Sequence, residues 1–167
     1  KNIKVWEEGT FDNYKTREPS QPILIKDLLT HTSGLSYGFM TGHPAIKLYT
    51  TSGIASAKNS KTRIEMDLEE FSITAASLPL LFDPGSQWHY SISIDILGRI
   101  IEVISGEKFD SFLKKYIFDP LNMVDTDFSV PEEKHYRFVD CYQELVSKTG
   151  NKLKRCFTGG EDVFSKP

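Results

Sequence analysis

Several common signatures of ligand and cofactor sites are missing from this sequence. It has no GxGxxG or GxxxxGK stretch, so no motif supports nucleotide binding, and it has no GxSxG elbow. Its four histidines are far apart, and none belongs to an HExxH or CxxC pattern, so the sequence implies no metal and no organic cofactor. Cys141 and Cys156 are too few for a disulfide framework. We interpret them as free thiols, although they flank a stretch that can form a hairpin.

Long apolar runs and an excess of basic charge are also missing. No stretch reaches the ~20 consecutive apolar residues of a spanning helix, and residues 1–10 lack the apolar core of a signal peptide. The net charge is −3, with 20 basic and 23 acidic residues, and no basic run is interleaved with aromatic residues. We therefore expect a soluble protein, cytoplasmic or periplasmic, that binds neither membranes nor nucleic acids. The oligomeric state stays open.

The residues that are present favour a single core built mainly from helices. Apolar residues make up 39% of the 167, which is enough for one core. They recur at helical spacing in 25–34, 67–78, 92–104 and 108–119, and Asp67 stands where the second helix needs an N-cap. Residues 35–64 predict a loop with one short helix. From Arg137 the pattern turns β-like, because RFVDCYQELV and KLKRCF are joined by the turn sequence SKTGN. The predicted fold class is mainly α with a small β hairpin.

The third helical stretch carries the clearest apolar stripe. Its members are Ile92, Ile96, Leu97, Ile100, Ile101 and Ile104. Ser91 or Ser93 can cap this helix, and the turn sequence PGSQWHY leads into it. Tyr90 therefore lies at a helix entrance, where a tyrosine either packs in the core or presents its phenol to a substrate.

Two Ser-x-x-Lys matches require a decision, because a lysine one helical turn after a serine can take its proton. They are Ser105–Lys108 and Ser111–Lys114. With 16 serines and 15 lysines in 167 residues, one or two such matches arise by chance, so we interpret both as accidental. The KTG sequence at Lys148 resembles the third box of penicillin-recognising enzymes. Its neighbours favour a tight turn, and we prefer that structural interpretation.

Four landmarks follow one another in a specific order. They are ILIKDLLTHTSGLSYG (23–38), PLLFDPGSQWHYSISIDILGRIIEVISG (79–106), YIFDPLNMVDTDFSV (116–130) and TGGEDVFSKP (158–167). Together they resemble the class C β-lactamase-like serine hydrolases, a family that includes carboxylesterases, acyltransferases and D-alanyl-D-alanine carboxypeptidases. The LLTHTSGL string and the PG-x-x-W-x-YS turn carry most of the resemblance, which extends from about Ile23 to the end of the chain.

The resemblance implies a role for Tyr90. In the family, the tyrosine of the second box sits at a helix entrance and acts with the Ser-x-x-Lys lysine in proton transfer, and Tyr90 matches that tyrosine. The substrate-binding positions that the resemblance implies are His89, Ile92, Gly159 and Gly160. Trp88 is a further candidate for the acyl pocket, but we interpret it as a core residue.

The sequence departs from the family pattern in two ways. The Ser-x-x-Lys box of the family precedes the LLTHTSGL string, and its closing strands follow the GG-x-x-VFS landmark; the chain from Lys1 to Pro167 contains neither. The family's Tyr-x-Asn box also becomes Tyr90-Ser91-Ile92. An isoleucine cannot hydrogen-bond a substrate amide, so this change favours an esterase or acyl-transfer enzyme over an efficient β-lactamase.

We therefore predict a fragment of a serine hydrolase, similar to β-lactamases and penicillin-binding proteins, that acts through an acyl-enzyme on a small-molecule ester or amide. Without its nucleophile the chain is expected to be inactive alone. The predicted parts are a lead-in at 1–22, a helical subdomain at 23–130 with the tyrosine box, and a hairpin at 131–167 from the edge of the α/β domain of the β-lactamase/transpeptidase-like fold. The alternative is a non-catalytic helical interaction module derived from the same scaffold.

Overall fold

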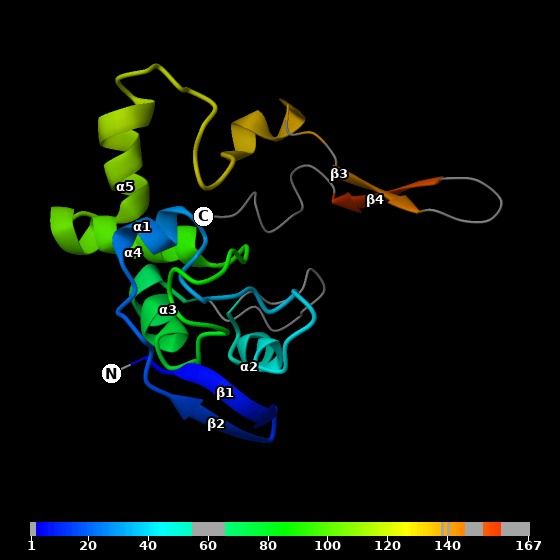
Figure 1. Cartoon of the computed structure of the whole chain (residues 1–167). Helices are drawn as coiled ribbons and strands as arrows, with labels where there is room; N and C mark the ends of the chain where they lie inside the picture. Colours follow the sequence, from blue (N-terminus) through cyan, green and yellow to red (C-terminus); the bar gives the residue numbers. More distant parts are fainter. Residues whose placement is uncertain (1–2, 55–65, 138, 140, 146–151, 158–167) are drawn as a thin grey trace. The chain divides into compact units, whose positions relative to one another are not determined.

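The structure, a computed structural model, describes residues 3–54, 66–137, 139, 141–145 and 152–157. The chain forms two compact units, Lys1–Phe109 and Asp110–Pro167. The first contains strands β1 (Val5–Thr10) and β2 (Asn13–Arg17) and helices α1 (Ile25–Leu29), α2 (Ile46–Thr51), α3 (Leu68–Ala75) and α4 (Ser93–Ser105) (Figure 1). After α5 (Phe109–Leu113), the second contains the π-helical turn η1 (Lys114–Phe118), the 3₁₀ helix η2 (Glu132–Arg137) and strands β3 (Cys141–Leu145) and β4 (Lys152–Phe157).

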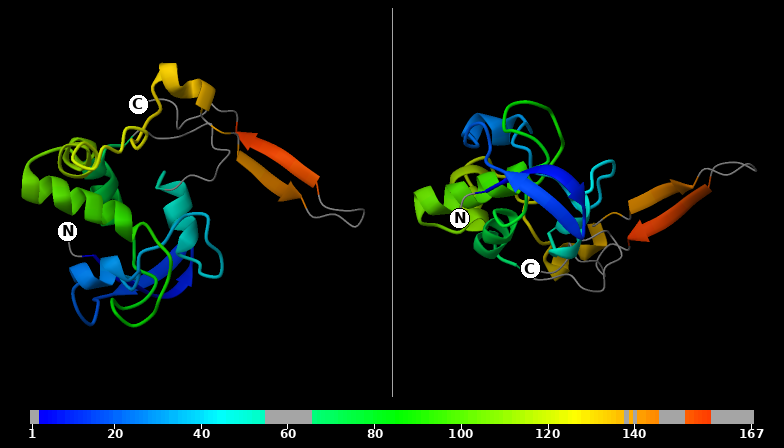
Figure 2. Two further views of the ribbon diagram at one scale, coloured as in Figure 1. Left: turned by 90° about the horizontal axis from the view of Figure 1, so that it is seen from above. Right: turned by 60° about the horizontal axis from the view of Figure 1, so that its bottom comes forward.

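The described residues are mostly helical, with two small antiparallel sheets (Figure 2). The fold class predicted from the sequence is confirmed, but the β1–β2 hairpin was not expected. Leu80 extends this hairpin: its carbonyl oxygen accepts a 2.8 Å hydrogen bond from Trp6 N, and its own N–H donates to Lys4 O at 2.8 Å. Trp6 also stacks on Tyr14, with ring centroids 4.8 Å apart. Residues 5–17 therefore form a paired element that is joined to the rest of the first unit at Leu80.

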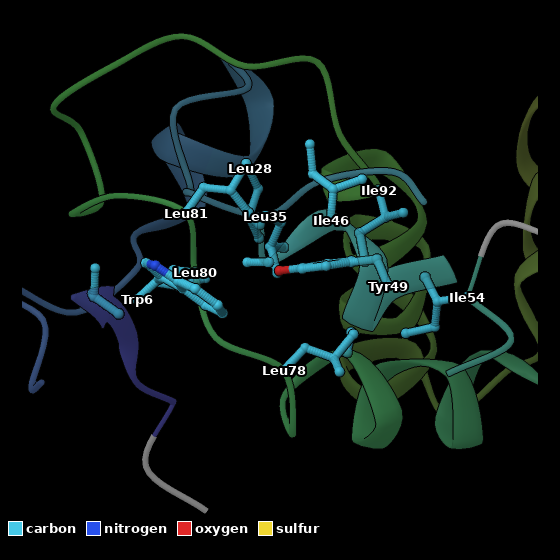
Figure 3. Close-up of a cluster of buried hydrophobic side chains, with 13 residues drawn as sticks. Trp6, Leu28, Leu35, Ile46, Tyr49, Ile54, Leu78, Leu80, Leu81 and Ile92 are labelled. Carbon is cyan, nitrogen blue, oxygen red and sulfur yellow. The ribbon is translucent and has the colours of Figure 1, made fainter. Parts of the chain in front are cut away.

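The hydrophobic core lies entirely in the first unit as far as the described residues go. Its buried members are Val5, Trp6, Leu28, Leu35, Ala45, Ile46, Tyr49, Ile54, Ala75, Leu78, Leu80, Leu81 and Ile92 (Figure 3). They come from strand β1, helices α1, α2 and α3 and segments between the elements, so no local segment could bury them alone. The hydroxyl of Tyr49, which is fully buried, donates to Pro79 O at 3.0 Å and satisfies the only polar atom of that side chain.

Two of the expected helices agree with the structure in different degrees. Asp67 is the N-cap of α3, because its side chain accepts a 2.9 Å hydrogen bond from Glu70 N, as predicted. Helix α4 spans nearly the predicted range and ends at Gly106 in the left-handed conformation. Ile104, however, was expected on its buried stripe and is 78% exposed, so that assignment is wrong.

The predicted hairpin of the second unit is confirmed. Strands β3 and β4 pair antiparallel, and the register places Cys141 opposite Phe157, with Cys156 at the irregularity that follows. The predicted divisions at residues 22 and 130 do not coincide with the division between the two compact units, which falls between Phe109 and Asp110.

Candidate active site

Residues 32–34 and 81–85 are distant in sequence but lie side by side in the first unit. Backbone hydrogen bonds join Gly85 N to Thr32 O at 2.7 Å and Leu81 N to Gly34 O at 2.8 Å. Gly34 has a φ of +85°, and a Cβ added there would lie 2.5 Å from Phe82 O. Only glycine tolerates this conformation and this approach, which explains the glycine that ends the HTSG sequence.

Tyr90 lies at the junction of these two segments. Its side chain is 46% exposed, so it does not plug the core. One side of its ring contacts His31, at 4.8 Å between centroids, and it also contacts Tyr37, at 5.3 Å. Tyr90 is thus held by aromatic neighbours while part of it remains open to solvent, which is the arrangement a phenol needs to meet a substrate.

Tyr37, which contacts Tyr90, is hydrogen-bonded to Asp95, and neither residue was expected at this site from the sequence. The Tyr37 hydroxyl donates to Asp95 Oδ2 at 3.3 Å. Burial, reinforced by the Asp95 charge, raises the pKa of Tyr37, so it stays protonated and can donate. Burial also raises the pKa of Asp95, against the opposing effect of the Tyr37 hydrogen bond. Tyr37 belongs to the first landmark, and Asp95 lies in the first turn of α4. A search for polar groups within those landmarks could have found them.

His89 has a defined partner below the surface. Its Nε2 is 2.9 Å from the hydroxyl of Ser36, which is fully buried, and its ring meets the edge of Phe82 at 6.3 Å. Burial lowers the pKa of His89 and, together with the charge of His89, that of His43. The imidazole of His89, the residue before Tyr90, is therefore held by Ser36 and is only partly accessible to solvent.

The remaining residues expected at the site differ in their exposure and in whether the structure describes them. Trp88 is 68% exposed, so its assignment to the core is wrong; its ring meets the edge of His31 at 6.4 Å between centroids. Ile92 has no exposed surface and belongs to the core, so its side chain offers nothing for a substrate to contact. Gly159 and Gly160 lie outside the described residues.

Neither Ser-x-x-Lys match has the hydrogen bond that a nucleophile and its base require. The Ser105 hydroxyl donates to Ile101 O at 2.7 Å, while Lys108 pairs with Asp67 at 3.4 Å. Ser111 contacts its neighbour Asp110, while Lys114 pairs with Asp119 at 2.9 Å. Lys148 lies outside the described residues.

A cavity of about 560 Å³ lies within the second unit and shares no residue with the Tyr90 region. Its charged groups neutralise one another, because Asp125 accepts from Arg137 at 3.1 Å and pairs with Lys134 at 3.1 Å. The described residues that line this cavity include no serine–base pair and no group of metal ligands that would support catalysis there. Within the described ranges, no group of three or more histidine, cysteine or acidic residues is placed to hold a metal ion. No helix in those ranges is long and apolar enough to cross a membrane.

Comparison with known proteins places this geometry among related enzymes. The Beta-lactamase family model matches residues 4–160. The chain is 36% identical over 124 residues to lovastatin esterase of Penicillium rubens, which covers 73% of this chain and 29% of the esterase. It is 31% identical over 166 residues to the acyltransferase mokF of Monascus pilosus, covering 92% of this chain and 37% of that protein.

Solved structures give the same result. The structure of simvastatin synthase, LovD, from Aspergillus terreus matches with a TM-score of 0.66 and 28% sequence identity, covering 92% of this chain and 36% of LovD. This chain therefore spans only 29% to 37% of the length of these relatives.

Proposed function

The chain belongs to the Beta-lactamase family, and on that premise we propose that it is the part of an acyl-transferring serine hydrolase that supplies the proton-transfer tyrosine, Tyr90. The observation that carries this proposal is the setting of Tyr90. Its phenol is half-exposed at the entrance to α4, and its ring is held by His31 and Tyr37. Named relatives of the chain are esterases and acyltransferases, which perform the acyl transfer that such a phenol can assist.

The proposed chemistry uses Tyr90 as a proton carrier. A serine outside this chain attacks the ester carbonyl carbon, and its proton passes to the phenolate of Tyr90. The phenol then gives that proton to the leaving alkoxide as the C–O bond of the ester breaks, and an acyl-enzyme remains. An ordinary tyrosine has a pKa of ~10, so a neighbouring cation must stabilise the phenolate. We assign that cation to the lysine of a Ser-x-x-Lys box, also outside the chain.

The proposed substrate is a small-molecule ester rather than a β-lactam. The residue two positions after Tyr90 is Ile92, which is buried and has no amide with which to hold a lactam side chain. Two exposed aromatic side chains contact the residues that hold Tyr90: Trp88 meets His31 at 6.4 Å between ring centroids, and Phe39 stacks on Tyr37 at 4.8 Å. These rings offer an apolar surface to the acyl or alcohol part of an ester.

The proposal is tested by covalent labelling. The full-length protein that carries this chain, and the 167-residue chain itself, are incubated with a fluorophosphonate and analysed by intact mass. We expect one adduct on the full-length protein, on a serine outside this chain, and none on the chain alone. An adduct on Ser105 or Ser111 would contradict the assignment of the nucleophile. A full-length protein that neither labels nor hydrolyses activated esters would instead favour the non-catalytic interaction module.

A further inference from the structure

His31 adopts a backbone conformation that needs an explanation. Its φ is +55°, in the left-handed region that few residues other than glycine enter, although asparagine, aspartate and histidine do so more often than the rest. His31 is the first residue after the C-cap of α1, and a left-handed residue at this position is a common way for a helix to end. The N–H of His31 donates to Leu28 O at 3.4 Å and that of Thr32 to Asp27 O at 2.8 Å, as in a Schellman motif. This helix end places the ring of His31 against the ring of Tyr90, with the centroids 4.8 Å apart.

His31 accepts hydrogen bonds from both residues that flank Tyr90 in the sequence. The His31 carbonyl oxygen accepts from His89 N at 2.8 Å, and His31 Nδ1 accepts from Ser91 N at 3.3 Å. The ring of Tyr90, between these two attachment points, packs against the imidazole at 4.8 Å. A single residue therefore fixes the backbone before and after the tyrosine and also the orientation of its ring.

Three buried serine hydroxyls extend this contact inward. Ser33 Oγ lies 2.8 Å from Ser93 Oγ, which lies 2.7 Å from Ser91 Oγ, and none of the three side chains is exposed. Ser91 Oγ is in turn 3.4 Å from His31 Nδ1. These hydrogen-bonded hydroxyls form a hydroxyl chain, and at its end away from His31 the N–H of Leu35 donates to Ser33 Oγ.

The groups at the two ends of this hydroxyl chain determine the direction in which its hydroxyls donate. If each hydroxyl donates toward His31, every hydrogen meets an acceptor, and the last acceptor is His31 Nδ1. If each hydroxyl instead donates away from His31, the buried hydroxyl of Ser33 has no acceptor among the hydrogen bonds of the described residues, and a buried donor without an acceptor destabilises the fold. The Ser91 N–H also points at Nδ1, at 3.3 Å, so the single lone pair of Nδ1 is shared between the hydroxyl and the N–H of Ser91. Both requirements call for an imidazole with its proton on Nε2.

We propose that His31 is the positioning residue of Tyr90: its carbonyl oxygen and Nδ1 hold the backbone on either side of the tyrosine, and the buried serines fix its tautomer. This inference rests on the proposed function of Tyr90, because positioning matters only if the phenol reacts. His31 itself moves no proton in this scheme.

The kinetic test compares two amides at position 31 in the full-length protein. His31→Asn puts an acceptor where Nδ1 was and tolerates a positive φ, whereas His31→Gln carries its amide one bond further away. Misplacement of a catalytic group by about 1 Å can cost ~100-fold. We expect kcat for ester hydrolysis to fall about 10- to 100-fold in His31→Gln, with KM within about threefold of wild type. His31→Asn should retain a kcat at least about tenfold above that of the glutamine variant.

Thermal midpoints establish that both variants fold. Equal kcat losses in the two variants, a loss confined to KM, or wild-type kcat in a folded His31→Gln would each overturn the inference while leaving the proposed function intact. If His31→Gln does not fold, Ser93→Ala replaces it, because that change breaks the hydroxyl chain without touching His31 or Tyr90. A severalfold lower kcat at unchanged KM then supports the inference, and an unchanged kcat overturns it.

A second measurement does not depend on activity. ¹⁵N NMR of the imidazoles in the 167-residue chain, at about pH 8 where histidine is neutral, reports which ring nitrogen carries the proton. We expect His31 to be protonated at Nε2 only, with contacts between its ring protons and those of Tyr90. Protonation at Nδ1, or absence of those contacts, would overturn the positioning role. An inactive full-length wild type would refute the proposed function, and this NMR result would then decide the geometry separately.

Discussion

The two compact units differ in how completely they bury their apolar side chains. In the first, Tyr49, Leu80 and Ile92 have no exposed surface. In the second, no residue is buried among 110–137, 139 and 142, and Leu121 and Val124 are about two-thirds exposed, at 67% and 66%. Apolar residues at helical spacing occur in both, so spacing alone does not produce a core. The difference shows that Tyr90 is attached to the unit whose packing can hold it in place.

Truncation of a core leucine should separate the units most strongly. Leu80→Ala removes a fully buried side chain that joins the β1–β2 hairpin to the core, so we expect the free energy of unfolding to fall by about 2 to 5 kcal/mol. Leu121→Ala, in the second unit, should change it by no more than about 0.5 kcal/mol. Urea denaturation of both variants measures this. Similar losses would mean that the exposed leucine is not a neutral surface residue.

Within the first unit, two glycines distinguish close packing from backbone conformation. Both have positive φ, but a Cβ on Gly34 would lie 2.5 Å from Phe82 O, while Gly42 has nothing within 4 Å. Gly42→Ala should cost only the conformational strain, roughly 1 to 2 kcal/mol. Gly34→Ala adds a backbone clash, and we expect about 2 to 4 kcal/mol in total. If thermal denaturation gave equal losses for the two, the HTSG segment would not approach residue 82 as closely as described.

The smallest expected effect is a pH dependence of stability. Burial lowers the pKa of both His43 and His89 below the ordinary value of 6.5 in the folded state. The unfolded chain therefore binds more protons as the pH falls below about 6.5, and the folded state loses stability there; above that pH no loss occurs. Urea titrations at several pH values should show this decline, and His89→Asn should reduce it. A decline unchanged in that variant would assign it to other groups.

The features that the sequence predicts correctly depend on local signals. Asp67 is an N-cap followed by a helical pattern, and the β3–β4 hairpin follows from two β-like runs around a turn sequence. The position of Tyr90 at a helix entrance follows from the turn that precedes Ser91 and the stripe that begins at Ile92. Each of these inferences needs only residues that are close together along the chain.

The features that the sequence does not predict depend on distant contacts. The β1–β2 hairpin has no strong turn signal and is extended by Leu80, which is more than 60 residues further along. Trp88 looks like a core residue by composition, but its exposure depends on which surfaces surround it. The meeting of His31 with Ser91 spans 60 positions, and no periodicity connects the two residues.

If Tyr90 carries a proton during acyl transfer, Tyr90→Phe removes the group that carries it. The change keeps the ring and its contacts with His31 and Tyr37 and removes only the hydroxyl. We measure ester hydrolysis and the thermal midpoint of the full-length wild type and variant. We expect a kcat lower by ~10² to 10⁴, or about 3 to 5 kcal/mol of barrier, with a loss of stability of no more than about 1 kcal/mol. A kcat within about threefold of wild type would contradict this expectation and make Tyr90 a structural residue.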